Sequence, residues 1–251
     1  MVDQLLWGLT YEEIISKAKT SLGSFLTGVC QSHGLDHSVN VLEHCEKALA
    51  SNIRPVSFEE SVLLSLAALL HDADDHKFFT SSADGNNATH ILKFCSDNQI
   101  SEDQTNFVLK VIDFVSCSKN HNRIPEEAKE KPELLYPRYA DRLEALGEEG
   151  VKRTFVYTGT TKGAYFTENT PRPKTEEEIW KYATTERFEN YKGGSDSMLD
   201  HFYDKLLHLA NFNSGNPYFD AITKERRQLM FDVCLYFGEQ GKLHPIYATW
   251  E

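Results

Sequence analysis

Apolar residues recur along most of the chain at the three- and four-residue spacing of helices that bury one face. Four of these segments open with Ser or Thr followed three positions later by Glu or Gln, a spacing typical of helix N-termini. The four openings are at Thr10, Ser57, Ser101 and Thr175. The pattern predicts an all-α fold.

The same pattern predicts a helix over 37–50 capped by Asp36, and terminal helices over 5–18 and 221–237, the second ended by Gly238. Only 154–158 has the β-branched and aromatic run of a strand, and it fits the continuation of a helix equally well. The region 159–175 is rich in Gly, Thr, Pro and Lys, which predicts a long loop of the kind used as lids or binding loops.

No repeat, low-complexity tail or linker divides the sequence. We therefore expect a single domain over 1–251, in which the terminal helices pack on a central helical core. A chain of 251 residues is long enough to bury a core of this kind.

The charge and cysteine content narrow the classes of partner. The net charge of −12 disfavours a long nucleic acid, because an acidic protein repels phosphate backbones, but it allows a small anionic substrate at a local positive centre. The five cysteines contain no C-x-x-C pair, which argues against a zinc ribbon and a disulfide framework. With no apolar run of about 20 residues and no basic leader, we expect a cytoplasmic protein that does not enter a membrane.

The first candidate chemistry is the pair His71-Asp72, which ends the apolar run Val62 to Leu70. A buried imidazole and a buried carboxylate are costly unless they are paired or bind a metal. The alternative is a His that interacts with the helix C-terminus beside a solvated Asp.

Two further residues carry the same ambiguity. His37 shares a helical face with Val41 and His44, and an imidazole on such a face is often an ordinary core residue. Asp141 is expected at the start of an apolar-periodic helix, where a carboxylate also interacts favourably with the helix dipole.

The order His37, His71-Asp72, Asp141 resembles the metal-binding signature of the HD superfamily of phosphohydrolases. Segments 66–78 and 140–147 are similar to the YpgQ-type nucleotide pyrophosphohydrolases of bacteria, and the similarity continues through 153–159 and 199–207. The resemblance implies an all-α HD-domain helical bundle around a metal site. Its motif core would span about 32–147, with a helical extension and lid loop over 148–251.

The resemblance also implies a ligand set and a cofactor. His37, His71, Asp72 and Asp141 would hold one divalent ion, which in this superfamily is manganese, iron, nickel, magnesium or zinc, because imidazole and carboxylate ligands suit such ions. A second metal at His90 and His121 is disfavoured, since the flanking patterns differ from those of two-metal members. Tyr139 replaces an acidic residue of many bacterial relatives.

By the same resemblance Asp75 would act as general base toward the attacking water, and Lys77 would offset phosphate charge. The alternative for both is a solvated charged loop. The expected substrate-binding residues are Arg142, Arg153, His201, Tyr203 and Lys205. Their structural alternatives are a salt bridge for Arg142 and core packing for Tyr203.

The implied activity is hydrolysis of a small phosphorylated metabolite, with a nucleoside or deoxynucleoside triphosphate cleaved to monophosphate and pyrophosphate as the leading hypothesis. A 5′-nucleotidase, a phosphodiesterase or a guanosine-tetraphosphate hydrolase would use the same chemistry on another bond. A nucleotide- or metal-binding sensor without turnover, and a di-iron oxygenase, are the alternatives from other classes. A homo-oligomer is compatible with the sequence.

Overall fold

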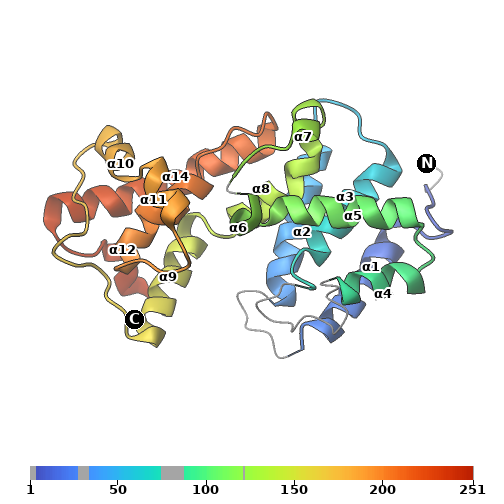
Figure 1. The fold of residues 1–251 in the computed structure, drawn as a ribbon, viewed down its shortest axis with the longest axis horizontal. Coiled ribbons are helices and arrows are strands. Elements are labelled where there is room, and N and C mark those ends of the chain that lie inside the picture. Colours follow the sequence, from blue (N-terminus) through green and yellow to red (C-terminus); the bar gives the residue numbers. More distant parts are fainter. Residues whose placement is uncertain (1–3, 28–33, 75–87, 121, 251) are drawn as a thin grey trace. The chain divides into compact units, whose positions relative to one another are not determined.

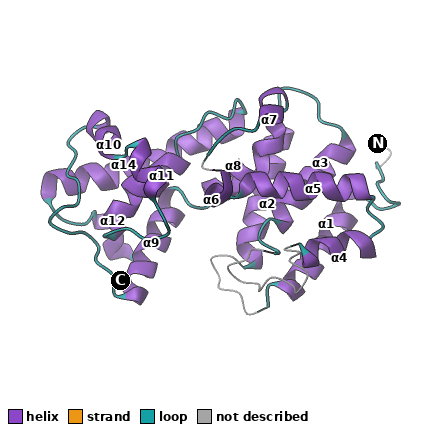
Figure 2. Ribbon diagram, in the orientation of Figure 1, coloured by secondary structure: helices purple, strands orange, loops and turns teal. Residues whose placement is uncertain are grey.

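The computed structural model describes residues 4–27, 34–74, 88–120 and 122–250. Throughout these ranges the regular structure is helical, and no strand occurs apart from one isolated bridge between Leu6 and Leu9 (Figures 1 and 2). The predicted all-α fold is therefore confirmed. None of the described helices has the length and apolar character needed to cross a membrane.

The chain divides into two compact units. The first comprises 1–141 together with 215–218, and the second comprises 142–214 together with 219–251. The single-domain organisation stays a prediction.

The first unit is built around one buried helix. Its longer helices are α1 (Tyr11–Phe25), α2 (Leu35–Ala50), α3 (Phe58–Leu70), α4 (Thr89–Asp97) and α5 (Glu102–Val115). Shorter helices follow at α6 (Cys117–Asn120), α7 (Glu126–Glu130) and η2 (Pro132–Leu135), before α8 (Tyr136–Leu143), whose last two residues belong to the second unit. All nine residues from Val62 to Leu70 of α3 are buried, and α1, α2 and α5 pack against this helix (Figure 1). A helix enclosed by its neighbours must be apolar on all sides, and this run is apolar at every position except Ser65.

Side-chain caps set the starts of these helices where the sequence predicts them. The hydroxyls of Thr10, Ser57 and Ser101 accept hydrogen bonds from backbone N–H groups in the first turns of α1, α3 and α5. Such bonds satisfy donors that have no partner within the helix.

The second unit contains α9 (Gly147–Thr161), α10 (Glu176–Tyr182), α11 (Thr185–Asn190), α12 (Met198–His201), the π-helical segment η3 (Phe202–Leu206), α13 (Leu207–Leu209), α14 (Pro217–Gln240) and η4 (Pro245–Thr249). Pro217 and Tyr218 of α14 belong to the first unit. Thr175 caps α10 as predicted, and the region between α9 and α10 is a loop.

Several predicted boundaries are wrong. The N-terminal helix begins at Tyr11 rather than residue 5, because Thr10 supplies the cap. Helix α2 begins at Leu35 with Gly34 as its N-cap, so Asp36 lies inside the first turn. For residues 154–158 the sequence left a strand and a helix open, and they continue helix α9.

The C-terminal helix also passes through Gly238 and ends at Gln240. A Cβ at Gly238 would lie 1.7 Å from the carbonyl oxygen of Pro173, so this glycine permits a close backbone approach. Gly241, with φ of +65°, follows the helix end in the left-handed conformation that glycine tolerates.

Candidate metal centre

Three helices of the first unit supply the candidate metal ligands. His37 lies in the first turn of α2, and His71 is the C-cap residue of α3, with Asp72 in the turn that follows. Asp141 lies near the end of α8, not at the start of a helix as predicted. Helix α8 begins at Tyr136, directly after η2, and ends two residues beyond Asp141, so Asp141 lies in its last turn.

The two imidazoles and two carboxylates converge. Nε2 of His37 lies 3.3 Å from Oδ1 of Asp141 and 3.8 Å from Oδ2 of Asp72. Nε2 of His71 lies 3.5 Å from Oδ2 of Asp72 and 3.6 Å from Oδ1 of Asp141. His37, His71 and Asp72 each offer one potential ligand atom, and these three atoms all lie within 4.8 Å of one another.

The orientation of His71 is set by its own helix. Nδ1 of His71 lies 2.8 Å from the carbonyl oxygen of Ala68. A carbonyl only accepts, so Nδ1 carries the proton and Nε2 presents its lone pair toward the carboxylates when the ring is neutral. Backbone contacts of this kind commonly fix the tautomer of a metal-binding histidine.

The burial of these groups fits a bound cation. Nε2 of His71 is buried and makes no hydrogen bond, since both neighbouring carboxylate oxygens are too distant for a good one. The side chains of His37 and His71 are 6% and 2% exposed, whereas that of Asp141 is 34% exposed. The residues therefore suit a divalent ion with N/O ligation that is reached from the side of Asp141.

The electrostatics of the cluster favour positive charge. Burial by itself would lower the pKa of His71, but Asp72 and Asp141 outweigh it and raise that pKa to about 9. Burial acts to raise the pKa of Asp141, yet His37 and His71 hold it well below the usual range. A site that stabilises an imidazolium this strongly also stabilises a metal cation.

The predicted catalytic residues Asp75 and Lys77 lie outside the described residues, as does His121. His90 is described, and its Nδ1 lies 2.7 Å from Oδ1 of Asp74. The sequence does not single out Asp74, because an acidic residue among several after a His-Asp pair carries no distinguishing signal.

The five predicted substrate-binding residues all belong to the second unit. Arg142 is buried, and Nη1 of Arg153 donates to the carbonyl of Glu144. Tyr203 is buried, and its hydroxyl lies 3.4 Å from the carbonyl oxygen of Pro171. These surroundings are those of packed side chains, and a role in substrate binding stays a prediction for each.

His201 and Lys205 are brought together at Tyr191. The His201 ring lies 5.3 Å from the Tyr191 ring, and Nζ of Lys205 lies 5.4 Å from the same ring centre. Burial and the charge of Lys205 lower the pKa of His201 to about 4. The sequence does not indicate Tyr191, because it lies outside every motif that carries the resemblance.

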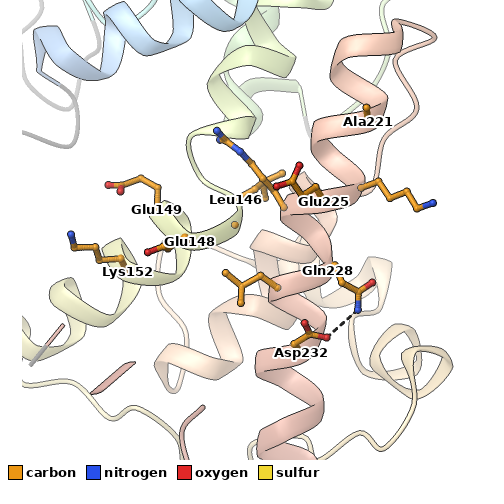
Figure 3. Close-up of a pocket in the computed structure, with 12 residues that line it drawn as sticks. Leu146, Glu148, Glu149, Lys152, Ala221, Glu225, Gln228 and Asp232 are labelled. Carbon is orange, nitrogen blue, oxygen red and sulfur yellow. Dashed lines mark hydrogen bonds between the residues drawn. The ribbon is translucent and has the colours of Figure 1, made fainter. Parts of the chain in front are cut away.

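A pocket of about 950 Å³ lies in the second unit between the first turns of α9 and the face of α14 (Figure 3). Its charged lining residues include four carboxylates, those of Glu148, Glu149, Glu225 and Asp232. None of the predicted site residues lines it, so the pocket is separate from the chemistry that the sequence predicts.

Comparison with solved structures shows that several bacterial proteins share the fold of this chain. A protein from Lactobacillus plantarum matches at a TM-score of 0.64 and 21% identity, over 90% of this chain and 95% of the other. An HD-superfamily hydrolase from Bacillus thuringiensis matches at 0.59 and 21%, over 92% and 100%. Bacillus subtilis YpgQ matches at 0.60 and 19%, over 93% and 99%.

At the level of sequence, an uncharacterised protein of Acanthamoeba polyphaga mimivirus, L803, is 40% identical over 220 residues, which cover 82% of this chain and 88% of the viral protein. The chain belongs to the same family as this viral protein. No family model matches the sequence.

Proposed function

We propose that this protein is a metal-dependent phosphohydrolase that cleaves a nucleoside or deoxynucleoside triphosphate to the monophosphate and pyrophosphate. The convergence of His37, His71, Asp72 and Asp141, with imidazole–carboxylate separations of 3.3–3.8 Å, carries the proposal. The HD-superfamily hydrolase among the structural neighbours supports the class of reaction. A YpgQ structure in complex with ADP, which covers 89% of this chain at a TM-score of 0.57, supports a nucleotide as the substrate.

The four residues would hold one divalent ion, which is manganese, iron, nickel, magnesium or zinc, because imidazole and carboxylate ligands suit such ions. Mn²⁺ serves as the probe in the experiments below. When bound, such an ion lowers the pKa of water and polarises a phosphoryl oxygen. The four described cysteines, Cys45, Cys95, Cys117 and Cys234, are free thiols, in keeping with a reducing compartment such as the cytoplasm.

In the proposed reaction a water oxygen bonds to the α-phosphorus while the bond from that phosphorus to the bridging oxygen of the β-phosphate breaks. Asp75 would accept the proton of the water, and the leaving pyrophosphate would take the bonding electron pair. Lys77 would offset the negative charge that develops on the phosphates. Both roles derive from the motif alone.

The test is an assay of the purified protein with Mn²⁺ against nucleoside tri-, di- and monophosphates and a cyclic dinucleotide. Phosphate and pyrophosphate are measured separately, and bound metal is counted. We expect pyrophosphate from triphosphates and one ion per chain. Phosphate released from monophosphates would identify a 5′-nucleotidase, and cleavage of the cyclic dinucleotide a phosphodiesterase. Metal and nucleotide binding without turnover would overturn the proposal in favour of a sensor.

A further inference from the structure

Asp74 follows the candidate ligand Asp72 by two residues, and its carboxylate is engaged by a different element of the first unit. Oδ1 of Asp74 accepts hydrogen bonds from the backbone N–H of His90 at 3.0 Å and from its Nδ1 at 2.7 Å. Oδ2 accepts a third from the backbone N–H of Ile91 at 2.9 Å. The Asp74 side chain is only 8% exposed, so these bonds are shielded from water.

The partners of Asp74 lie in the first turn of α4, which begins at Thr89. The N-cap residue of this helix is Ala88, which supplies no side-chain hydrogen bond. The first N–H groups of a helix have no partner within it, and its N-terminus favours a negative charge. Asp74 therefore caps α4 from outside the helix, in the place of the missing Ser, Thr, Asp or Asn.

The cap also holds the turn that carries Asp72. On the N-terminal side of Asp72, Nδ1 of His71 donates a hydrogen bond to the carbonyl oxygen of Ala68 and anchors the turn to α3. On the C-terminal side, Asp74 anchors it to α4 through three hydrogen bonds. Asp72 is thus held from both sides, with its Oδ2 at 3.5 and 3.8 Å from the Nε2 atoms of His71 and His37.

We propose that Asp74 is a positioning residue of the metal centre: by capping α4 it holds the backbone of the 71–74 turn so that Asp72 faces the two histidines. The inference rests on the proposed function, since it requires a metal at this site. Residues that orient metal ligands without touching the metal typically change metal affinity by roughly 10–100-fold when replaced. Asp74 differs from them in acting through the backbone of a turn.

The experiment compares Mn²⁺ affinity in the intact protein and in Asp74→Ala, from the EPR signal of free Mn²⁺ during titration. A matched control is Ser101→Ala, which removes the side-chain cap of α5 in the same unit. Both variants lose a helix cap, so both are expected to show a lower Tm. Only Asp74→Ala is expected to bind Mn²⁺ about tenfold more weakly or worse.

The outcomes separate the two proposals. An unaltered protein that binds no Mn²⁺ overturns the metal site itself, and with it the proposed function. An unaltered protein that binds Mn²⁺ while Asp74→Ala binds it equally well overturns the positioning role alone. If Asp74→Ala does not fold, Asp74→Asn and His90→Ala each remove part of the network. A loss of affinity in these variants that exceeds the loss in Ser101→Ala supports the role, and affinities equal to that of the unaltered protein overturn it.

Discussion

Nε2 of His37, at the start of helix α2, lies 3.3 Å from Oδ1 of Asp141, at the end of helix α8. The contact joins the first and last members of the motif that the sequence presents in order. Because the same carboxylate oxygen also lies 3.6 Å from Nε2 of His71, Asp141 faces both imidazoles.

Asp141→Asn should weaken Mn²⁺ binding by tenfold or more and abolish most turnover, because it removes a negative charge from the ligand set. It should also lower the pKa of His71 from about 9, since Asp141 is one of the two carboxylates that raise it. Mn²⁺ titration, steady-state kinetics and NMR titration of the metal-free protein provide the readouts. Asp97→Asn is the control, because its carboxylate is largely exposed and pairs with Lys93. An unchanged His71 pKa in Asp141→Asn would contradict the arrangement.

Asp75→Asn should lower kcat by roughly 10²–10⁴-fold, the contribution typical of a general base. Its Mn²⁺ affinity should stay near that of the unaltered protein, because Asp75 is not among the proposed ligands. Kinetics at saturating Mn²⁺ and a direct Mn²⁺ titration separate the two effects. A kcat close to that of the unaltered protein would exclude Asp75 as the base.

Gly150→Ala should destabilise the protein by about 2–3 kcal/mol, the cost of forcing extra volume into a packed site. A Cβ at residue 150 would lie 2.1 Å from the carbonyl oxygen of Ala145. Relieving this contact requires a shift of the backbone, which costs more free energy than the rotation of a flexible side chain. Gly194→Ala is the control, because a Cβ there meets nothing within 4 Å. Urea denaturation of both variants measures the difference. Equal stability of the two would show that the turn before α9 can relax.

The folded protein should lose stability as the pH falls from about 6.5 toward 4, in part through His201. Burial and the charge of Lys205 lower the pKa of His201 to about 4, whereas an unfolded histidine titrates near 6.5. Between these values the unfolded chain binds a proton that the folded chain does not. The free energy of unfolding therefore decreases as the pH is lowered through this range. The decrease in Tm from pH 7 to pH 5 should therefore be smaller in His201→Gln than in the unaltered protein. An equal drop in both would argue against the lowered pKa.

The local features of the fold could be predicted from the sequence. Thr10, Ser57, Ser101 and Thr175 cap helices as their spacing to Glu or Gln indicates. The apolar run before His71 correctly predicts a buried helix. These features depend on residues within a few positions of one another, which a sequence displays directly.

Features set by distant parts of the chain could not be predicted in the same way. The strand-like run 154–158 is helical as part of α9, and α14 continues through Gly238, where the backbone of Pro173 approaches. Asp141 lies near the end of a short helix whose start the apolar pattern did not reveal. Local preference is weak in such segments, so the surrounding structure decides their conformation.

For the candidate site, the sequence by itself determined the order of His37, His71, Asp72 and Asp141 and the resemblance that this order carries. Only the tertiary structure decided that the Nε2 atoms of the two histidines lie 3.3–3.8 Å from carboxylate oxygens of the two aspartates. It also decided that the Asp74 carboxylate accepts hydrogen bonds at the start of α4. The physical reason is that the distance between residues remote in sequence depends on how helices pack. Helix packing in turn follows from the burial of whole faces rather than from any single motif.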